Sequence, residues 1–140
     1  MIIKKYLKTF FLLVFIIALG ACKKENEDLT TDIVGTYTSG VGSTATQIIV
    51  TKIDNTTVSV YISHDEFYPT IYTHASTKMN SKTTFTLNDV TEVNSGNRFE
   101  YKGTGSASNN NIVIQHTEKM FDNASGSLIT DYSNTYIGSK

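Results

Sequence analysis

The chain has 140 residues, with 12 basic and 13 acidic side chains and a formal net charge of −1. This length provides for one domain with a core of moderate size. The charge balance argues against a nucleic-acid-binding protein, which needs a basic face. The single cysteine excludes an internal disulfide and a cysteine-based metal centre.

The first 21 residues have the three-part form of an export signal. Lys4, Lys5 and Lys8 form a basic head, residues 10–19 form an apolar core, and small residues follow. The uncharged run is too short to cross a bilayer comfortably, because a spanning helix needs roughly 20 apolar residues. We therefore expect a cleaved signal peptide, and an uncleaved N-terminal anchor is the alternative.

This segment ends on the only cysteine of the chain. Leu19, Gly20, Ala21 and Cys22 resemble the lipobox of a bacterial lipoprotein signal, in which the cysteine is lipidated and becomes the new N-terminus. The resemblance implies that the mature chain keeps nine basic and thirteen acidic residues, a net charge of −4. It also implies stable attachment to a membrane through two or more acyl chains.

Residues 22–32 are charged and almost free of apolar side chains, so we expect a flexible tether. Lys23 stands where an aspartate is associated with retention in the inner membrane. The run from Lys23 to Asp28, basic and then acidic, resembles the surface-export signals of Bacteroidota lipoproteins. The resemblance implies a lipid-anchored protein of the outer membrane, on the cell surface or on the periplasmic face.

From Ile33 onward, apolar and polar residues alternate with a period of two. Val58, Val60 and Ile62 fall on one face of a segment and Tyr61 falls on the other, which is the pattern of a half-buried strand. Similar alternation predicts strands at 33–38, 46–53, 57–63, 70–77, 83–88, 97–105, 111–118 and 128–137.

Turn residues separate these segments at intervals close to ten residues. Asp54-Asn55, Asn94–Asn97 and Asn109–Asn111 favour tight hairpins, and Pro69 favours the end of a loop before a strand. Eight short strands with hairpin spacing predict one all-β domain over residues 33–140. We expect an antiparallel up-and-down barrel, with a β-sandwich as the alternative.

Two segments carry a family resemblance. Ile33–Tyr37 resembles the opening of the lipocalin-like (calycin-type) small β-barrel lipoproteins of Bacteroidota, with Gly35-Thr36-Tyr37 where that family has Gly-x-Trp. Gly103–Gly105, followed by Ile112–Ile114, is similar as well. The resemblance implies that Tyr37 closes the floor of the barrel, and that the domain binds a small apolar or amphipathic ligand without catalysis.

The chain also departs from the family pattern. Thr130-Asp131-Tyr132 matches the letters of a second lipocalin motif but lies in the last predicted strand. The arginine of the third motif is missing, since Arg98 is the only arginine and lies upstream.

The histidines are the candidates for metal or proton chemistry. His64 and Glu66 follow one predicted strand and His74 lies on the next, so a hairpin would bring the three together. A metal site needs three or four converging ligands, and we favour solvated loop residues, with neither metal nor cofactor. His116 continues the face of Ile112 and is expected to be a hydrogen-bonded interior histidine.

No nucleophile or acid–base pattern stands out. The sequence lacks a Gly-x-Ser-x-Gly elbow, and Gly40–Ser43 lacks the Lys-Ser/Thr ending of a P-loop. Asp65 and Glu66 are adjacent, which in a strand would direct them to opposite faces. We therefore predict a protein that is not an enzyme.

Tyrosines are the remaining candidates for ligand contact. A tyrosine offers a rigid apolar ring and a polar tip, which suits both ligand pockets and protein contacts. The alternative is that the tyrosines pack the core or bridge neighbouring strands. We expect a monomer that binds a small hydrophobic ligand, or otherwise a surface or periplasmic protein-interaction or inhibitor module. The predicted ligand-binding residues are Tyr61, Tyr72, His116 and Tyr132.

Overall fold

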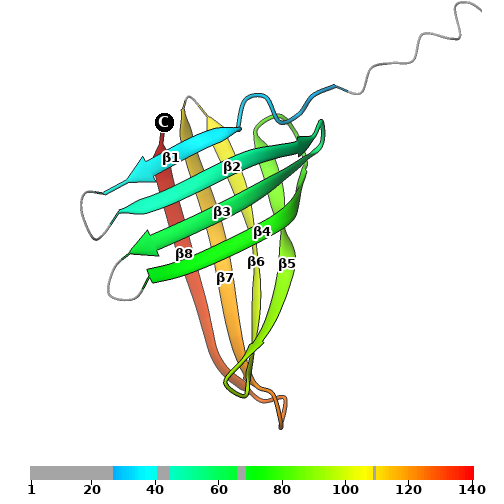
Figure 1. Ribbon diagram of the computed structural model, residues 1–140, viewed down its shortest axis with the longest axis vertical. Coiled ribbons are helices and arrows are strands. Elements are labelled where there is room, and N and C mark those ends of the chain that lie inside the picture. Colours follow the sequence, from blue (N-terminus) through cyan, green and yellow to red (C-terminus); the bar gives the residue numbers. More distant parts are fainter. Residues whose placement is uncertain (1–26, 41–44, 66–68, 109) are drawn as a thin grey trace, which may run out of the picture.

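The computed structural model describes residues 27–40, 45–65, 69–108 and 110–140 (Figure 1). The expected signal peptide and Cys22 lie outside the described residues. The strands are β1 (Gly35–Ser39), β2 (Thr46–Asp54), β3 (Thr57–Asp65), β4 (Pro69–Met79), β5 (Thr84–Asn94), β6 (Asn97–Ser108), β7 (Asn111–Asp122) and β8 (Leu128–Ser139).

Each strand pairs antiparallel with the next, and β1 pairs with β8, so the eight strands form a closed up-and-down barrel. The predicted all-β barrel is confirmed. Within the described ranges, no helix has the length and apolar character of a membrane span.

The largest difference from the predicted strands is the length of the hairpins. β5 continues to Asn94 rather than ending at residue 88, and β7 continues to Asp122 rather than 118. The turn between β5 and β6 has positive φ at Ser95 (50°) and Gly96 (83°), as a tight two-residue hairpin requires. Because this turn keeps Asn94 opposite Asn97, the ladder extends to its end.

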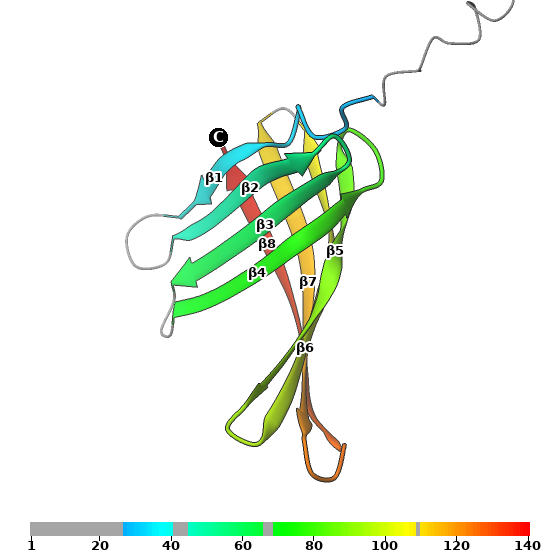
Figure 2. The ribbon, with the colours of Figure 1, turned by 45° about the vertical axis from the view of Figure 1, so that its right-hand side comes forward.

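The barrel consists of two halves that cross each other. β1–β4 lie across β5–β8, and β5–β8 extend well past them as an uncovered sheet (Figures 1 and 2). The two seams between the halves are short. In the described part of the chain, β4 pairs with β5 only at Lys78 and Met79, and β1 pairs with β8 only at Thr38. The barrel is therefore closed near one end and split along both seams toward the other.

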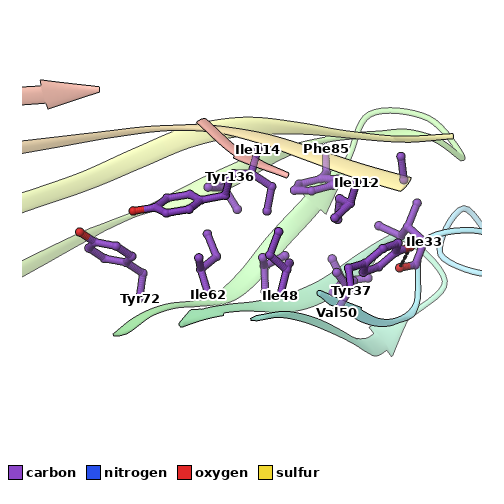
Figure 3. Close-up of a cluster of buried hydrophobic side chains, with 14 of the residues drawn as sticks. Ile33, Tyr37, Ile48, Val50, Ile62, Tyr72, Phe85, Ile112, Ile114 and Tyr136 are labelled. Carbon is purple, nitrogen blue, oxygen red and sulfur yellow. Dashed lines mark hydrogen bonds between the residues drawn. The ribbon is translucent and has the colours of Figure 1, made fainter. Parts of the chain in front are cut away.

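Apolar side chains fill the closed part (Figure 3). Tyr37 lies at one end of this core beside Ile33, and its hydroxyl donates a hydrogen bond of 2.7 Å to the carbonyl oxygen of Ile33. Burying an isoleucine or leucine side chain contributes about 1.5–3 kcal/mol. The side chains with the least exposure include Ile33, Tyr37, Ile48, Val58, Val60, Ile62, Phe85, Leu87, Ile112 and Ile114.

The end of the expected tether packs on this core. The Leu29 amide donates to the carbonyl oxygen of Asn55 at 2.8 Å, and Thr30 is fully buried. Asp28 forms an ion pair with Lys52. We call residues 28–30 the entry segment. It lies at the end of the barrel opposite the uncovered part of β5–β8 (Figures 1 and 2).

Candidate functional site

The inner face of β6, β7 and β8 changes from apolar to polar along its length. Directly paired residues point to the same side of a sheet, so the register defines rows across the strands. Ile114 pairs with Tyr136, and one row further from the core His116 pairs with Asn134. The next row holds Tyr101, Glu118 and Tyr132.

Aromatic rings gather where this change occurs, and we call the group the mouth cluster. Figure 3 shows Tyr72 and Tyr136 at one end of the buried core, with their hydroxyl groups pointing away from it. The ring centroid of Tyr72 lies 4.3 Å from that of His116 and 5.1 Å from that of Tyr101. The mouth cluster consists of Tyr72, His74, Tyr101, His116, Glu118 and Tyr136.

The two histidines of the mouth cluster form a directional pair. His74 Nδ1 lies 2.7 Å from the carbonyl oxygen of Asn88, and a carbonyl only accepts, so we assign the proton to Nδ1. Its Nε2 is then an acceptor, and His116 Nε2–H donates to it at 3.2 Å. His116 Nδ1 is left as a buried acceptor with no hydrogen-bond donor among the described residues.

Burial keeps this pair neutral. Loss of solvation, and second the repulsion that a protonated His74 would add, lower the pKa of His116 to about 4. Loss of solvation also lowers the pKa of His74 below its usual value. Both rings therefore carry no charge at pH 7.

Glu118 is a half-buried carboxylate held by a phenol. The Tyr72 hydroxyl donates to Glu118 Oε2 at 2.7 Å. Burial raises the pKa of Tyr72 far above its usual value, and this hydrogen bond is the second largest cause of the increase. Burial and the charges of Glu118 and Glu92 raise the pKa of Tyr101 to about 12. The site is thus neutral or negative in character.

Two hollows flank Tyr72. The larger, which we call the slot, has a volume of about 410 Å³ and follows the seam between β8 and the ends of β1, β2 and β3. The smaller, of about 10 Å³, lies on the other seam between Tyr72, Glu92 and Tyr101. The slot is lined by Ser39, Thr46, His64, Tyr72, Asn134, Thr135, Tyr136 and Ile137.

The structure brings three of the four predicted ligand-binding residues onto one face. Tyr72 and His116 are buried in the mouth cluster, and Tyr132 lies opposite Glu118, with 59% of its surface exposed. Tyr61 lies on the outer face of β3, because its neighbours on either side are fully buried and point inward.

Sequence reasoning missed Tyr101, Glu118 and Asn134. Their alternation with outward-facing neighbours was visible in the sequence. The place of Tyr101 and Glu118 in the mouth cluster, and that of Asn134 in the slot, depends on the register of β6, β7 and β8.

The three residues considered for a metal site have different surroundings. His64 Nδ1 lies 2.7 Å from Thr46 Oγ1, whereas His74 pairs with His116, and Glu66 lies outside the described residues. In the part of the chain that the structure describes, no three His, Cys, Asp or Glu side chains are grouped so that they could hold a metal ion.

Comparison with protein-family models, curated proteins and solved structures finds no significant match to this chain.

Proposed function

We propose that this chain is a non-catalytic binding domain that holds a small amphipathic ligand in the slot. The observation that supports this most is the lining of the slot, where the rings of Tyr72 and Tyr136 stand beside polar side chains. Its volume of about 410 Å³ lies within the 300–1,000 Å³ typical of small-molecule sites. It lies directly beyond a packed core, so one end of a ligand would contact rings and the other would reach solvent.

The lining favours an amphipathic ligand over a purely apolar one. Ser39, Thr46 and Asn134 offer hydroxyl and amide groups, while Tyr72 and Tyr136 offer ring faces. A few polar groups among aromatic surface fix the orientation of a ligand and provide specificity.

The proposal includes lipid anchoring of Cys22, as the lipobox resemblance implies. It also includes the outer membrane as the location, as the resemblance of residues 23–28 to surface-export signals implies. The entry segment and the uncovered sheet lie at opposite ends of the barrel (Figure 2). An anchor at Cys22 would thus attach to the end of the barrel opposite its open end.

The test is a titration of the full chain with 2-naphthol, a small neutral amphipathic molecule, in lipid nanodiscs. We expect the amide NMR signals of Tyr72, Asn134 and Tyr136 to shift with saturation. Asn134→Trp fills the slot and should weaken binding at least tenfold. Ser133→Trp, on the opposite face of the same strand, is the matched control and should bind as the unmodified chain does.

The slot would be excluded as the binding site if both tryptophan variants bound 2-naphthol equally. It would also be excluded if the shifted amide NMR signals were spread over the outer face. Empty nanodiscs give the background from partition of 2-naphthol into lipid.

A protein-interaction role is the second candidate, and β8 is the observation that favours it. Among the described residues, its edge away from β7 is paired only at Ser139. Unpaired edges are templates for another strand. Capture of a protein from intact cells by the full chain, lost on replacing Ile129 and Ile137 with Asn, would support this role. The exposed apolar side chains of β8 are Leu128, Ile129, Tyr132 and Ile137.

A further inference from the structure

We propose that the ligand carries an organic ammonium group, which is held on the inner face of β5–β8 between Glu118 and the surrounding tyrosine rings. This inference rests on the binding role proposed above and names the chemistry of the ligand. It follows from how charges and rings are distributed over the two faces of one sheet.

The basic side chains of β5–β8 lie on the outer face. Register and alternation place Arg98, Lys102 and Lys119 on the side opposite to Tyr101 and Glu118, and these three are the only lysines and arginines of the four strands. Two of them have carboxylate partners on their own face, Arg98 with Glu100 at 3.2 Å and Lys119 with Asp131 at 3.1 Å. The outer face is therefore close to balanced.

The inner face carries carboxylates without basic partners. Glu118 lies in the row between Tyr101 and Tyr132, and Glu92 lies one row further from the core. Among the described residues, neither carboxylate forms an ion pair with a lysine or an arginine. The neighbouring histidines add no compensating charge, because burial keeps both neutral. A face of one sign attracts ligands of the opposite sign.

Aromatic residues lie beside Glu118 on this face. Phe99 and Tyr101 are stacked with an angle of 8° between their planes, Tyr72 meets Tyr101 edge-on, and Tyr132 lies across the strand pair from Glu118. Aromatic faces attract cations through their quadrupole, and such arrangements recognise quaternary ammonium groups in particular. A carboxylate among rings therefore fits an alkylammonium ion better than a neutral or anionic group.

Tyr72 connects this face to the slot. Its side chain lines both hollows, and its hydroxyl donates to Glu118. A ligand whose apolar part occupies the slot would reach Glu118 with a group placed beside Tyr72. The amphipathic ligand proposed above then has a defined polarity, apolar in the slot and cationic toward β6 and β7.

The test compares choline with 3,3-dimethylbutan-1-ol, which has the same shape but a carbon atom in place of the charged nitrogen. The full chain is held in nanodiscs made without choline headgroups and followed by amide NMR. We expect choline to shift the signals of Tyr72, Tyr101 and Tyr132, and the neutral alcohol to bind at least tenfold more weakly.

Two matched pairs of variants locate the site. Glu118→Gln can still accept the hydrogen bond from Tyr72 and should weaken choline binding at least tenfold while 2-naphthol binds as before. Glu100→Gln, on the outer face, should change neither choline binding nor 2-naphthol binding. Tyr132 is largely exposed, so Tyr132→Leu should fold normally and weaken choline binding, whereas Tyr132→Phe should retain it.

The outcomes separate this inference from the proposed function. If 2-naphthol binds in the slot but choline and its neutral counterpart bind equally, or if Glu118→Gln and Glu100→Gln behave alike, the ammonium inference is wrong and the binding role stands. If neither 2-naphthol nor choline binds, both proposals fail.

Discussion

His74 and His116 lie 42 residues apart in the sequence, and their Nε2 atoms lie 3.2 Å apart inside the barrel. His74 belongs to β4 and His116 to β7, so the contact exists only because the two halves of the barrel close on each other. The pair lies at the polar end of the apolar core, and His74 also lines the smaller hollow.

The histidine pair predicts that acid destabilises the fold. An unfolded histidine takes up a proton near pH 6.5, whereas buried His116 does so only near pH 4. Between these values the unfolded state binds more protons, so stability falls as the pH falls. The loss from His116 reaches on the order of 3 kcal/mol by pH 4. Urea unfolding at pH 7 and at pH 4.5 measures it.

His116→Gln is the control for this pH dependence, because its amide can still donate to His74 but does not titrate. We expect the free energy of unfolding of the variant to change less between the two pH values than that of the unmodified chain. If the free energy of unfolding changes equally with pH in both proteins, the acid sensitivity comes from other groups.

The hydrogen bond from Tyr72 to Glu118 should contribute measurably to stability. Tyr72→Phe keeps the ring and removes the donor, which leaves a half-buried carboxylate with one hydrogen bond fewer. Bonds to charged groups contribute about 1.5–3 kcal/mol, so we expect the free energy of unfolding to fall by about 2 kcal/mol. Tyr61→Phe, on the outer face, should change it by less than about 0.5 kcal/mol. Similar losses in both variants would argue against the bond.

Lipid attachment at Cys22 is a separate prediction from the lipobox. In cells fed radiolabelled palmitate, the chain with its natural Cys22 should become labelled. Cys22→Ser should abolish the label and release the protein from the membrane fraction. Retention of the variant in membranes would instead favour an uncleaved N-terminal anchor.

The sequence was sufficient for the number and order of the strands and for their buried faces, although not for the ends of β5 and β7. The alternation around Val58, Val60 and Ile62 predicted an inward face, and all three side chains are fully buried. The same pattern placed His116 inside with Ile112, where it is hydrogen-bonded to His74. Local alternation is a property of one strand, so one sequence is enough to read it.

The seams and the site could not be read in this way. That β4 stays paired with β5 for only two residues depends on how the two halves cross, and alternation contains no such information. The approach of Tyr72 to Glu118, 46 positions later, depends on the same crossing. A slip of one residue in a strand reverses the face to which each of its side chains points. The tyrosines could therefore be named as candidates, but they could not be assigned to one site.

The packing of Phe85 on Gly105 offers the sharpest test of the core. These residues are paired across β5 and β6, and a Cβ atom at residue 105 would lie 2.0 Å from Cζ of the Phe85 ring. Gly105→Ala should therefore displace a fully buried ring and lower the free energy of unfolding by about 1–3 kcal/mol.

Phe85→Leu alone should lose stability through the smaller side chain, but it also makes room for the methyl group of Ala at residue 105. In the double variant we expect a smaller loss than the sum of the single losses, by at least about 0.5 kcal/mol. Strict additivity in urea unfolding would show that the ring does not rest on the glycine.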